Sequence, residues 1–331
     1  MKFLASLATR LQRLVPDPFI LALLVTLLLA TTLPASGKAA DWLGVLATSA
    51  VVLLFFLHGI RLPRENLVAA VMHWRLHLTI LATTFVVLPL LGLGLSSSMH
   101  GLLPAGLWAG LLFLCTLPST VQMSIALTSI ARGNVAASVA AAAASNLLGI
   151  IATPLVAGLV LSAHGNAAPL SGIWKIVLQL LLPFAVGHLL RPWLGAWAAR
   201  QRAVLSWADR LTVMISVYTA FSAAVLGGIW KQIPLVTLII LTALCAVLLT
   251  LVLTWTGLAA RMLGLNPADA RTLRYAGSLK SLVSGVPMAK VLFPSAEIGM
   301  IMLPIMIYHQ LQLMTCAWLA RRQGEASDDP V

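Results

Sequence analysis

The stretch GSLKSLVSGVP, residues 277–287, places a lysine, three serines and a proline inside an otherwise apolar run. A second stretch, LPSTVQMS at residues 117–124, interrupts another apolar run in the same way. Proline cannot supply the N–H that continues a helix, so each stretch predicts a broken helix. A break leaves backbone groups unpaired, which at membrane depth is tolerable only against a protein cavity or a ligand. The two stretches therefore predict that two broken helices line a binding site.

The chain as a whole has the composition of a membrane protein. Of its 331 residues, 60% are hydrophobic and 9% are charged, and the mean hydropathy is +0.99. A soluble domain carries about 25% charged residues. One protein core could not hide so much apolar surface, so the lipid bilayer is the predicted partner of the outer face.

Apolar runs long enough to span a membrane follow one another along the chain. A spanning helix needs about 20 such residues, and the predicted fold is an all-α membrane protein that forms one transmembrane unit over residues 1–331. The polar residues 323–331 are predicted to be a mobile cytoplasmic tail. The ten predicted spans are 17–36, 41–60, 76–95, 103–131, 135–162, 172–194, 206–229, 234–263, 270–293 and 298–320.

Basic residues predict the orientation of these spans. The formal charge of +12 would suggest a nucleic-acid partner in a soluble protein, but no basic stripe with interleaved aromatic residues occurs, so none is predicted. With the N-terminus in the cytoplasm, sixteen basic residues fall on the cytoplasmic side and four on the outer side. The sixteen are Lys2, Arg10, Arg13, Arg61, Arg64, Arg75, Arg132, Arg191, Arg200, Arg202, Arg210, Arg261, Arg271, Arg274, Arg321 and Arg322, and the four are Lys38, Lys175, Lys231 and Lys290. This asymmetry predicts a multi-pass protein of a bacterial-type inner (plasma) membrane with both termini in the cytoplasm.

The longest cytoplasmic connection, near residues 191–210, divides the spans five and five. An odd number of spans per half makes the second half start from the opposite side, so an internal repeat must be inverted. The first repeat covers about residues 17–162 and the second about 172–320. Helices four and nine, which occupy corresponding places, are the two that carry the interruptions.

The chain shows no pattern typical of an enzyme. Cys115, Cys245 and Cys316 lie in apolar runs without ligand spacing, and no catalytic or phosphate-binding motif is present. No metal site and no cofactor are predicted, apart from Na⁺ or H⁺ as a coupling ion. The acidic residues all lie in loops, helix ends or the tail, so no buried carboxylate is expected to hold such an ion.

Lys280 is the one charge predicted to lie inside the membrane. Such a charge costs at least about 2.5–3.5 kcal/mol on insertion scales and marks a functional site by default. Lys280 could be a fixed cation in the site or a proton carrier. Alternatively, it bonds to free helix carbonyl groups and only braces the break. Ser278, Ser281 and Ser284 follow the adjoining face at three-residue intervals.

Further polar residues lie in the apolar spans and are candidates for substrate or ion binding. Serine and threonine often bond to their own helix instead, and a histidine can serve as an interhelical hydrogen-bonding group. The candidates are Ser119, Thr120, Gln122, Ser124 and Thr128 in the fourth span, Ser138 and Asn146 in the fifth, and His309 and Gln310 in the tenth.

Several motifs resemble the bile acid:sodium symporter family and its divergent SBF-like branch. They are FFLHGI at 55–60, IARGNVAAS at 130–138, SLKSL at 278–282, GVPM at 285–288 and YHQ at 308–310. The resemblance implies ten helices in two inverted five-helix repeats, in which helices four and nine unwind and cross. It also implies a panel of helices one, two, six and seven facing a core, and organic anions driven by sodium as substrates.

The resemblance also shows where this sequence departs from the family's sodium-binding pattern. Ser124 and Ser138 match family serines, and with Ser278 they make at most a weak sodium site. Lys280 stands where a small residue is usual, which suggests that its ammonium group takes the role of a sodium ion. Ile125, Ala142, Ser278 and Leu282 stand where Asn, Thr, Glu and Gln are usual.

Two functions fit these features. The leading interpretation is a secondary transporter of a small organic anion, which works by alternating access. The sequence leaves open whether transport is coupled to sodium, coupled to protons or uncoupled. The alternative is a membrane regulator or scaffold that affects calcium homeostasis without transport, because the resembled branch includes a vertebrate member linked to calcium handling. The sequence does not distinguish a monomer from a dimer.

Overall fold

The computed structural model describes residues 18–61, 73–99, 101–163, 170–228, 233–294 and 297–325, which are helical and contain no strand. The predicted tail lies mostly outside these ranges, at residues 326–331. The basic residues Lys2, Arg10, Arg13, Arg64 and Lys231 also lie outside them.

The helices of the first half overlap the first five predicted spans. The third predicted span is bent around a π-helical turn, η1, and the fourth is divided into two helices. The bounds are α2 Pro18–Thr32, α3 Gly37–Arg61, α5 Trp74–Ala82, η1 Thr83–Val87, α6 Leu88–Ser98, α7 Ala105–Thr116, α8 Val121–Ile130 and α9 Val135–Ala163.

The helices of the second half overlap the other five predicted spans. A short helix, α11, joins the first two of them, and the ninth predicted span is divided in two. The bounds are α10 Leu170–Leu189, α11 Arg191–Arg200, α12 Arg202–Leu226, α14 Leu235–Met262, α15 Pro267–Ser278, α16 Leu282–Leu292 and α17 Ile298–Glu325.

Membrane-spanning character is clear for part of this set. Among the described residues, six helices are long and apolar enough to cross a membrane, and the bent pair α7 and α8 is a seventh if it counts as one span. The predicted all-α membrane fold is confirmed. The pair α15 and α16 is not among them. The segment from α15 to α16 carries five charged residues: Asp269, Arg271, Arg274, Lys280 and Lys290.

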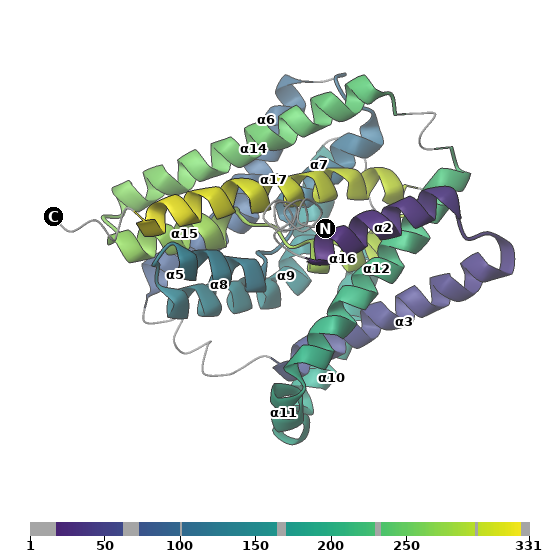
Figure 1. Cartoon of the computed structure of the whole chain (residues 1–331), viewed down its shortest axis with the longest axis horizontal. Coiled ribbons are helices and arrows are strands. Elements are labelled where there is room, and N and C mark those ends of the chain that lie inside the picture. The colour runs from purple at the N-terminus through teal and green to yellow at the C-terminus, as the bar shows by residue number, and fades with distance from the viewer. Residues whose placement is uncertain are drawn as a thin grey trace, which may run out of the picture.

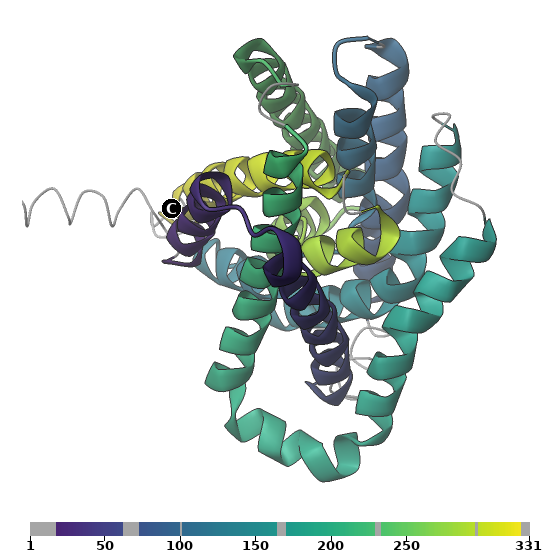
Figure 2. The ribbon, with the colours of Figure 1, turned by 90° about the vertical axis from the view of Figure 1, so that its right-hand side faces the viewer.

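The segments α2, α3, α10, α11 and α12 pack on one another and form what we call the panel (Figure 1). Its closest approach is between α3 and α10. A Cβ added to Gly59 would collide with the Phe184 carbonyl oxygen, and one added to Gly187 would collide with that of Phe56. The two glycines therefore let the helix backbones touch, as small residues do in membrane proteins. Figure 2 shows α11 crossing between the ends of α10 and α12.

The remaining helices form the core. Nearly every side chain of α7 is buried, and α7 packs against α6, α9 and α17. The half-helices α8, α15 and α16 lie beside α17, α14 and α12. Both broken segments are thus held in the middle of the molecule.

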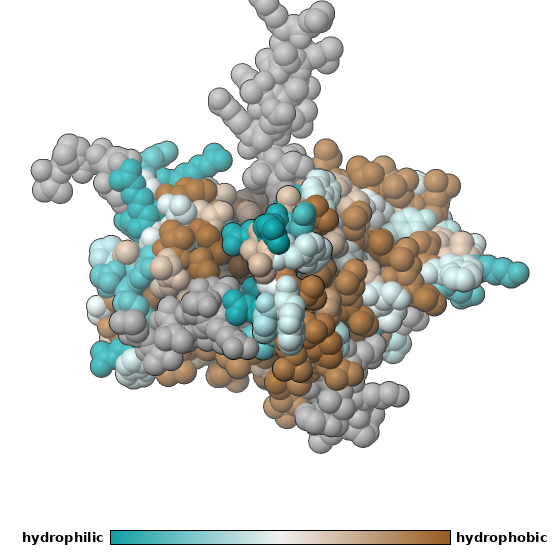
Figure 3. Space-filling view, turned by 90° about the horizontal axis from the view of Figure 1, so that it is seen from below, coloured by the Kyte–Doolittle hydropathy of each residue, from teal (hydrophilic) through white to brown (hydrophobic). Residues whose placement is uncertain are grey.

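The outer surface is largely apolar. Figure 3 shows hydrophobic side chains over much of one face, with hydrophilic ones gathered near its middle and at its edges. Large side chains such as Leu28, Leu159 and Leu235 are more than half exposed. Since water would penalise this exposure, lipid is the solvent that such a surface fits.

Candidate functional site

The two helix breaks meet at the centre of the protein. The Ser281 N–H donates to the Pro118 carbonyl oxygen across 3.0 Å, and the Thr120 hydroxyl donates to the Lys280 carbonyl oxygen across 2.8 Å. Residues about 160 positions apart in the sequence are therefore joined by one backbone and one side-chain hydrogen bond. The chain direction changes by 62° between α7 and α8.

Every carbonyl group from residue 115 to 119 at the first break has a partner. The Thr153 hydroxyl donates to Thr116 O across 2.9 Å, and the Asn146 amide donates to Ser119 O across 2.7 Å. The Lys280 ammonium group donates to the carbonyl oxygens of residues 115 and 117, and the Ser281 N–H donates to that of residue 118. The break is thus satisfied by protein groups, as burial away from water requires.

The second break is held by α17. The side chain of Gln312 pairs with both backbone polar groups of Lys280. Its Oε1 accepts from the Lys280 N–H at 2.7 Å, and its Nε2 donates to the Lys280 carbonyl oxygen at 2.8 Å. The Tyr308 hydroxyl donates to Ser278 O. Ser281 caps the start of α16 through the Ser284 N–H. Hydroxyl and amide groups thus replace the missing helical bonds.

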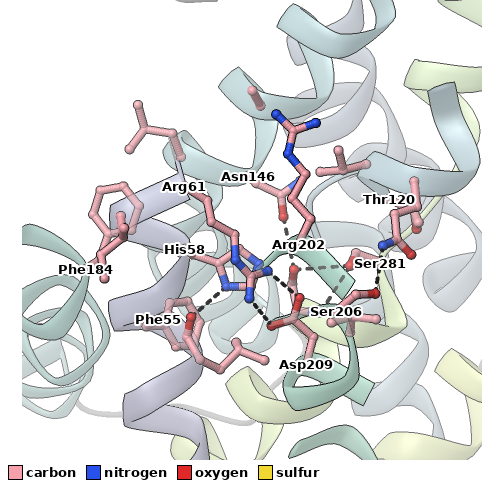
Figure 4. A pocket seen from close by; sticks show the side chains of 18 of the residues that line it. Phe55, His58, Arg61, Thr120, Asn146, Phe184, Arg202, Ser206, Asp209 and Ser281 are labelled. Carbon is pink, nitrogen blue, oxygen red and sulfur yellow. Dashed lines mark hydrogen bonds and ion pairs between the residues drawn. The ribbon is translucent and has the colours of Figure 1, made fainter. Parts of the chain in front are cut away.

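A cavity of about 700 Å³ lies between the panel and the crossing (Figure 4). On the core side, polar groups from the breaks and from α9 and α17 line it. On the panel side, α3, α11 and α12 supply charged and polar groups. The core residues are Thr120, Gln122, Asn146, Ser281, Ser284 and His309, and the panel residues are His58, Arg61, Arg191, Arg202, Ser206, Asp209 and Arg210.

The polar groups on the core side are positioned by hydrogen bonds. The Ser284 hydroxyl donates to Asn146 Oδ1 across 3.0 Å, while the Asn146 amide nitrogen holds the Ser119 carbonyl. His309 Nδ1 lies 2.9 Å from the Gln312 amide nitrogen. These side chains are therefore fixed before a ligand arrives, which is what selective binding needs.

The cavity is electropositive. Four arginines line it against one aspartate. Arg61 and Asp209 form an ion pair, with 2.6 Å between Nη1 and Oδ2, and arginines outnumber carboxylates among the lining residues. Phe19, Leu54, Phe55 and Phe184 add an apolar wall. The arrangement suits a small anion with an apolar part.

Six of the thirteen predicted site residues line the cavity: Thr120, Gln122, Asn146, Ser281, Ser284 and His309. The other seven, Ser119, Ser124, Thr128, Ser138, Ser278, Lys280 and Gln310, do not. Lys280 is 1% exposed, and its ammonium nitrogen donates to backbone carbonyl groups outside the cavity.

The hydroxyl groups considered for a weak sodium site are paired with protein atoms. Ser124 and Ser138 bond to each other across 3.0 Å, and Thr128 donates to Ser138 across 3.3 Å. The Ser278 hydroxyl instead donates to the Arg274 carbonyl of its own helix. The described residues include no group of three or more His, Cys, Asp or Glu that could hold a metal ion.

Sequence reasoning missed the charged side of the cavity. All four lining arginines were assigned to the cytoplasmic side, but they served only to predict the orientation of the spans. Their density around the longest connection was an available signal. It also selected Gln310 and passed over Gln312, which is fully buried and bonds the break.

An apolar helical bundle with a central cavity at two crossed helix breaks has the architecture of a multi-pass membrane transporter. Comparison with known proteins gives the family. The model of the SBF-like CPA transporter family matches residues 17–325, and the chain belongs to this family, which confirms the resemblance to the bile acid:sodium symporter group.

Similar proteins occur in bacteria and in vertebrates. The chain is 49% identical to the uncharacterized protein PA2026 of Pseudomonas aeruginosa over 318 residues, and this match covers 96% of each chain. It is 47% identical to the Escherichia coli (strain K12) protein YfeH, which is named as a candidate symporter, over 92% of each chain. The sodium/bile acid cotransporter 7-B of Xenopus laevis is 26% identical, over 92% of this chain and 90% of its own.

Proposed function

We propose that this protein is a secondary active transporter, without covalent chemistry, that carries a small organic anion by alternating access at the crossed breaks. The observation that supports it best is the cavity itself. It places arginines from the panel opposite hydroxyl and amide groups from the breaks. A substrate bound there contacts both bodies, so its binding energy depends on how they are arranged.

The proposed topology is ten spans in two inverted repeats, with both termini in the cytoplasm of a bacterial-type inner membrane. Its support is that the breaks fall in the fourth and ninth predicted spans, which are corresponding places. Arg61, Arg191, Arg202 and Arg210 all belong to the side rich in basic residues, which is the cytoplasmic side by the positive-inside rule. The cavity would then open to the cytoplasm in the arrangement described here.

Among the described residues, hydrogen bonds from Gln122 and from Lys290 join the core to the panel and would change during transport. Gln122 on α8 donates to the Ser206 hydroxyl on α12 across 3.3 Å, beside the cavity. Lys290 on α16 donates to the Thr219 hydroxyl on α12 across 3.2 Å, and the orientation above puts Lys290 toward the outer side. The second bond would help to close the outer end while the cavity opens inward.

The coupling ion in this proposal is a proton or sodium, and the pairing of hydroxyl groups argues against sodium. Ser124, Ser138 and Thr128 use their hydroxyl groups on one another. A sodium ion would have to compete with these bonds for oxygen ligands, which hard cations prefer.

Uptake by purified protein in liposomes tests the transport function. A set of radiolabelled organic anions, each with an apolar body and one or two acidic groups, is offered with and without a proton or sodium gradient. Anions that raise the Tm of the purified protein are chosen for this set beforehand. Uptake of at least one anion above empty liposomes supports the proposal.

A pair of variants tests the site. Arg202 lines the cavity, whereas Arg200, two residues away, does not. Arg202→Gln should weaken anion binding about tenfold, since a screened charge contact is worth about 1–2 kcal/mol, and Arg200→Gln should leave it unchanged. If no anion of the set is taken up and none stabilises the protein, the non-transporting regulator of ion homeostasis is favoured instead.

A further inference from the structure

The most completely enclosed cation in the described part of the chain is the ammonium group of Lys280. It donates to three backbone carbonyl oxygens, those of Thr84 at 3.0 Å, Cys115 at 2.9 Å and Leu117 at 2.6 Å. An ammonium group has three N–H donors, so this set uses all of them. Within the described residues, the one ion pair joins Arg61 to Asp209, so Lys280 has no carboxylate partner there.

The carbonyl group of Thr84 is one that its own helix leaves unpaired. In a regular α-helix it would accept from the Leu88 N–H. The π-helical turn η1 sends that N–H to Thr83 O instead, and Pro89, the next residue, has no N–H to offer. The π turn and the proline together therefore free the oxygen that Lys280 binds.

The carbonyl groups of Cys115 and Leu117 are freed by the break after α7. In an unbroken helix, Cys115 O would accept from the Ser119 N–H, which here donates to the Ser145 hydroxyl across 3.1 Å. Val121, the corresponding donor for Leu117, begins α8 beyond the 62° bend. The end of α7 also carries the negative pole of the helix dipole. Three unpaired oxygens from two spans thus converge on one cation.

The backbone of Lys280 is fixed as firmly as its ammonium group. Gln312 bonds both its N–H and its carbonyl, and Thr120 bonds the carbonyl a second time. The lysine thereby links η1, the end of α7 and the α15–α16 break into one unit. Because the side chain is buried outside the cavity, it cannot serve as the cation that a cavity ligand touches.

We infer that the carbonyl oxygens of Thr84, Cys115 and Leu117 form a monovalent-cation site whose resident ion is the tethered ammonium group of Lys280. A small free alkylammonium ion binds the same site when the side chain is shortened. Occupation of this site holds three spans of the core together. The inference concerns the stability of the core and does not rest on the proposed transport function.

Chemical rescue of Lys280→Ala tests this site. We expect the Tm of purified Lys280→Ala in detergent to fall by several degrees and to rise again with methylammonium or ethylammonium chloride. Tetramethylammonium chloride, which has the charge but no N–H donor, should not restore it. Lys290→Ala is the matched control, since Lys290 lies on the adjoining helix and bonds only the Thr219 hydroxyl among the described contacts. Its Tm should not respond to methylammonium.

Two results would overturn the inference. One is an unchanged Tm in Lys280→Ala, and the other is an equal response to methylammonium and tetramethylammonium. If Lys280→Ala does not fold, Lys280→Gln and Lys280→Met replace it. These side chains have the same length, but only glutamine carries N–H donors, so the glutamine variant should have the higher Tm. A methionine variant that is at least as stable would contradict a cation site.

Discussion

The guanidinium group of Arg61, the last residue of α3, donates two hydrogen bonds to the carboxylate of Asp209 on α12. The shorter joins Nη1 to Oδ2 at 2.6 Å and the longer joins Nη2 to Oδ1 at 3.3 Å. The pair fastens two panel helices at the edge of the cavity. It also cancels one of the four positive charges there, which sets the charge that a ligand meets.

A double-mutant cycle on Arg61 and Asp209 should reveal strong coupling. Each single alanine variant should lose about 1.5–3 kcal/mol, because hydrogen bonds between charged groups are strong and each truncation leaves a partly buried charge behind. The double variant should lose less than the sum of the two. Thermal unfolding of the four proteins measures this, and strict additivity would show that the pair contributes nothing.

The contact between α3 and α10 should be intolerant of even one methyl group. Gly59→Ala pushes a Cβ into the Phe184 carbonyl oxygen, so the helices must separate, at a cost of about 1–3 kcal/mol. Gly44→Ala in the same helix meets nothing within 4 Å and should be neutral or slightly stabilising, since alanine favours helix. The Tm difference between the variants is the measurement. Equal values would refute the close approach.

Gln312 and Gln310 should differ sharply although they lie two residues apart. Gln312→Ala leaves the Lys280 N–H without its side-chain acceptor, and a buried unpaired group costs about 1–3 kcal/mol. Gln310 is partly exposed, and its side chain makes no hydrogen bond among the described residues, so Gln310→Ala should change stability little. Thermal unfolding compares them. A larger loss for Gln310→Ala would reverse the roles assigned to these residues.

Sodium should not stabilise this protein specifically. The hydroxyl groups of Ser124, Ser138 and Thr128 already bond one another, so a sodium ion would gain few ligands that are not already in use. The Tm should be equal in sodium, potassium and choline chloride at the same ionic strength. A rise confined to sodium would identify a sodium site and restore sodium as the coupling ion.

Much of the fold could be predicted because lipid imposes local rules. Each span must be apolar over about 20 residues, and a proline beside polar residues marks where a span breaks. For this reason the positions of the helices and the first break, at residues 117–120 with Pro118, could be read from the sequence. The second interruption was also recognised, but its break lies at residues 279–281, ahead of Pro287, which is inside α16. Spans two to five, for example, begin within a few residues of α3, α5, α7 and α9.

The cavity could be predicted only in part. Hydroxyl and amide groups beside the breaks were recognised, and Asn146 and Ser284 do meet there. The arginines were missed because nothing local shows that the connection at α11 folds back against the ends of α3 and α12. That arrangement depends on packing between helices that are distant in the chain.

The sequence by itself determined that this protein is a helical membrane protein with two interrupted spans and a lysine, Lys280, within one of the interruptions. Those properties follow from the cost of placing each residue in lipid, which is additive along the chain. Only the tertiary structure decided where the charge points. Lys280 turns away from the cavity toward three carbonyl oxygens, one of them 196 residues distant, because a π turn, a proline and a bend leave those oxygens unpaired at the same place.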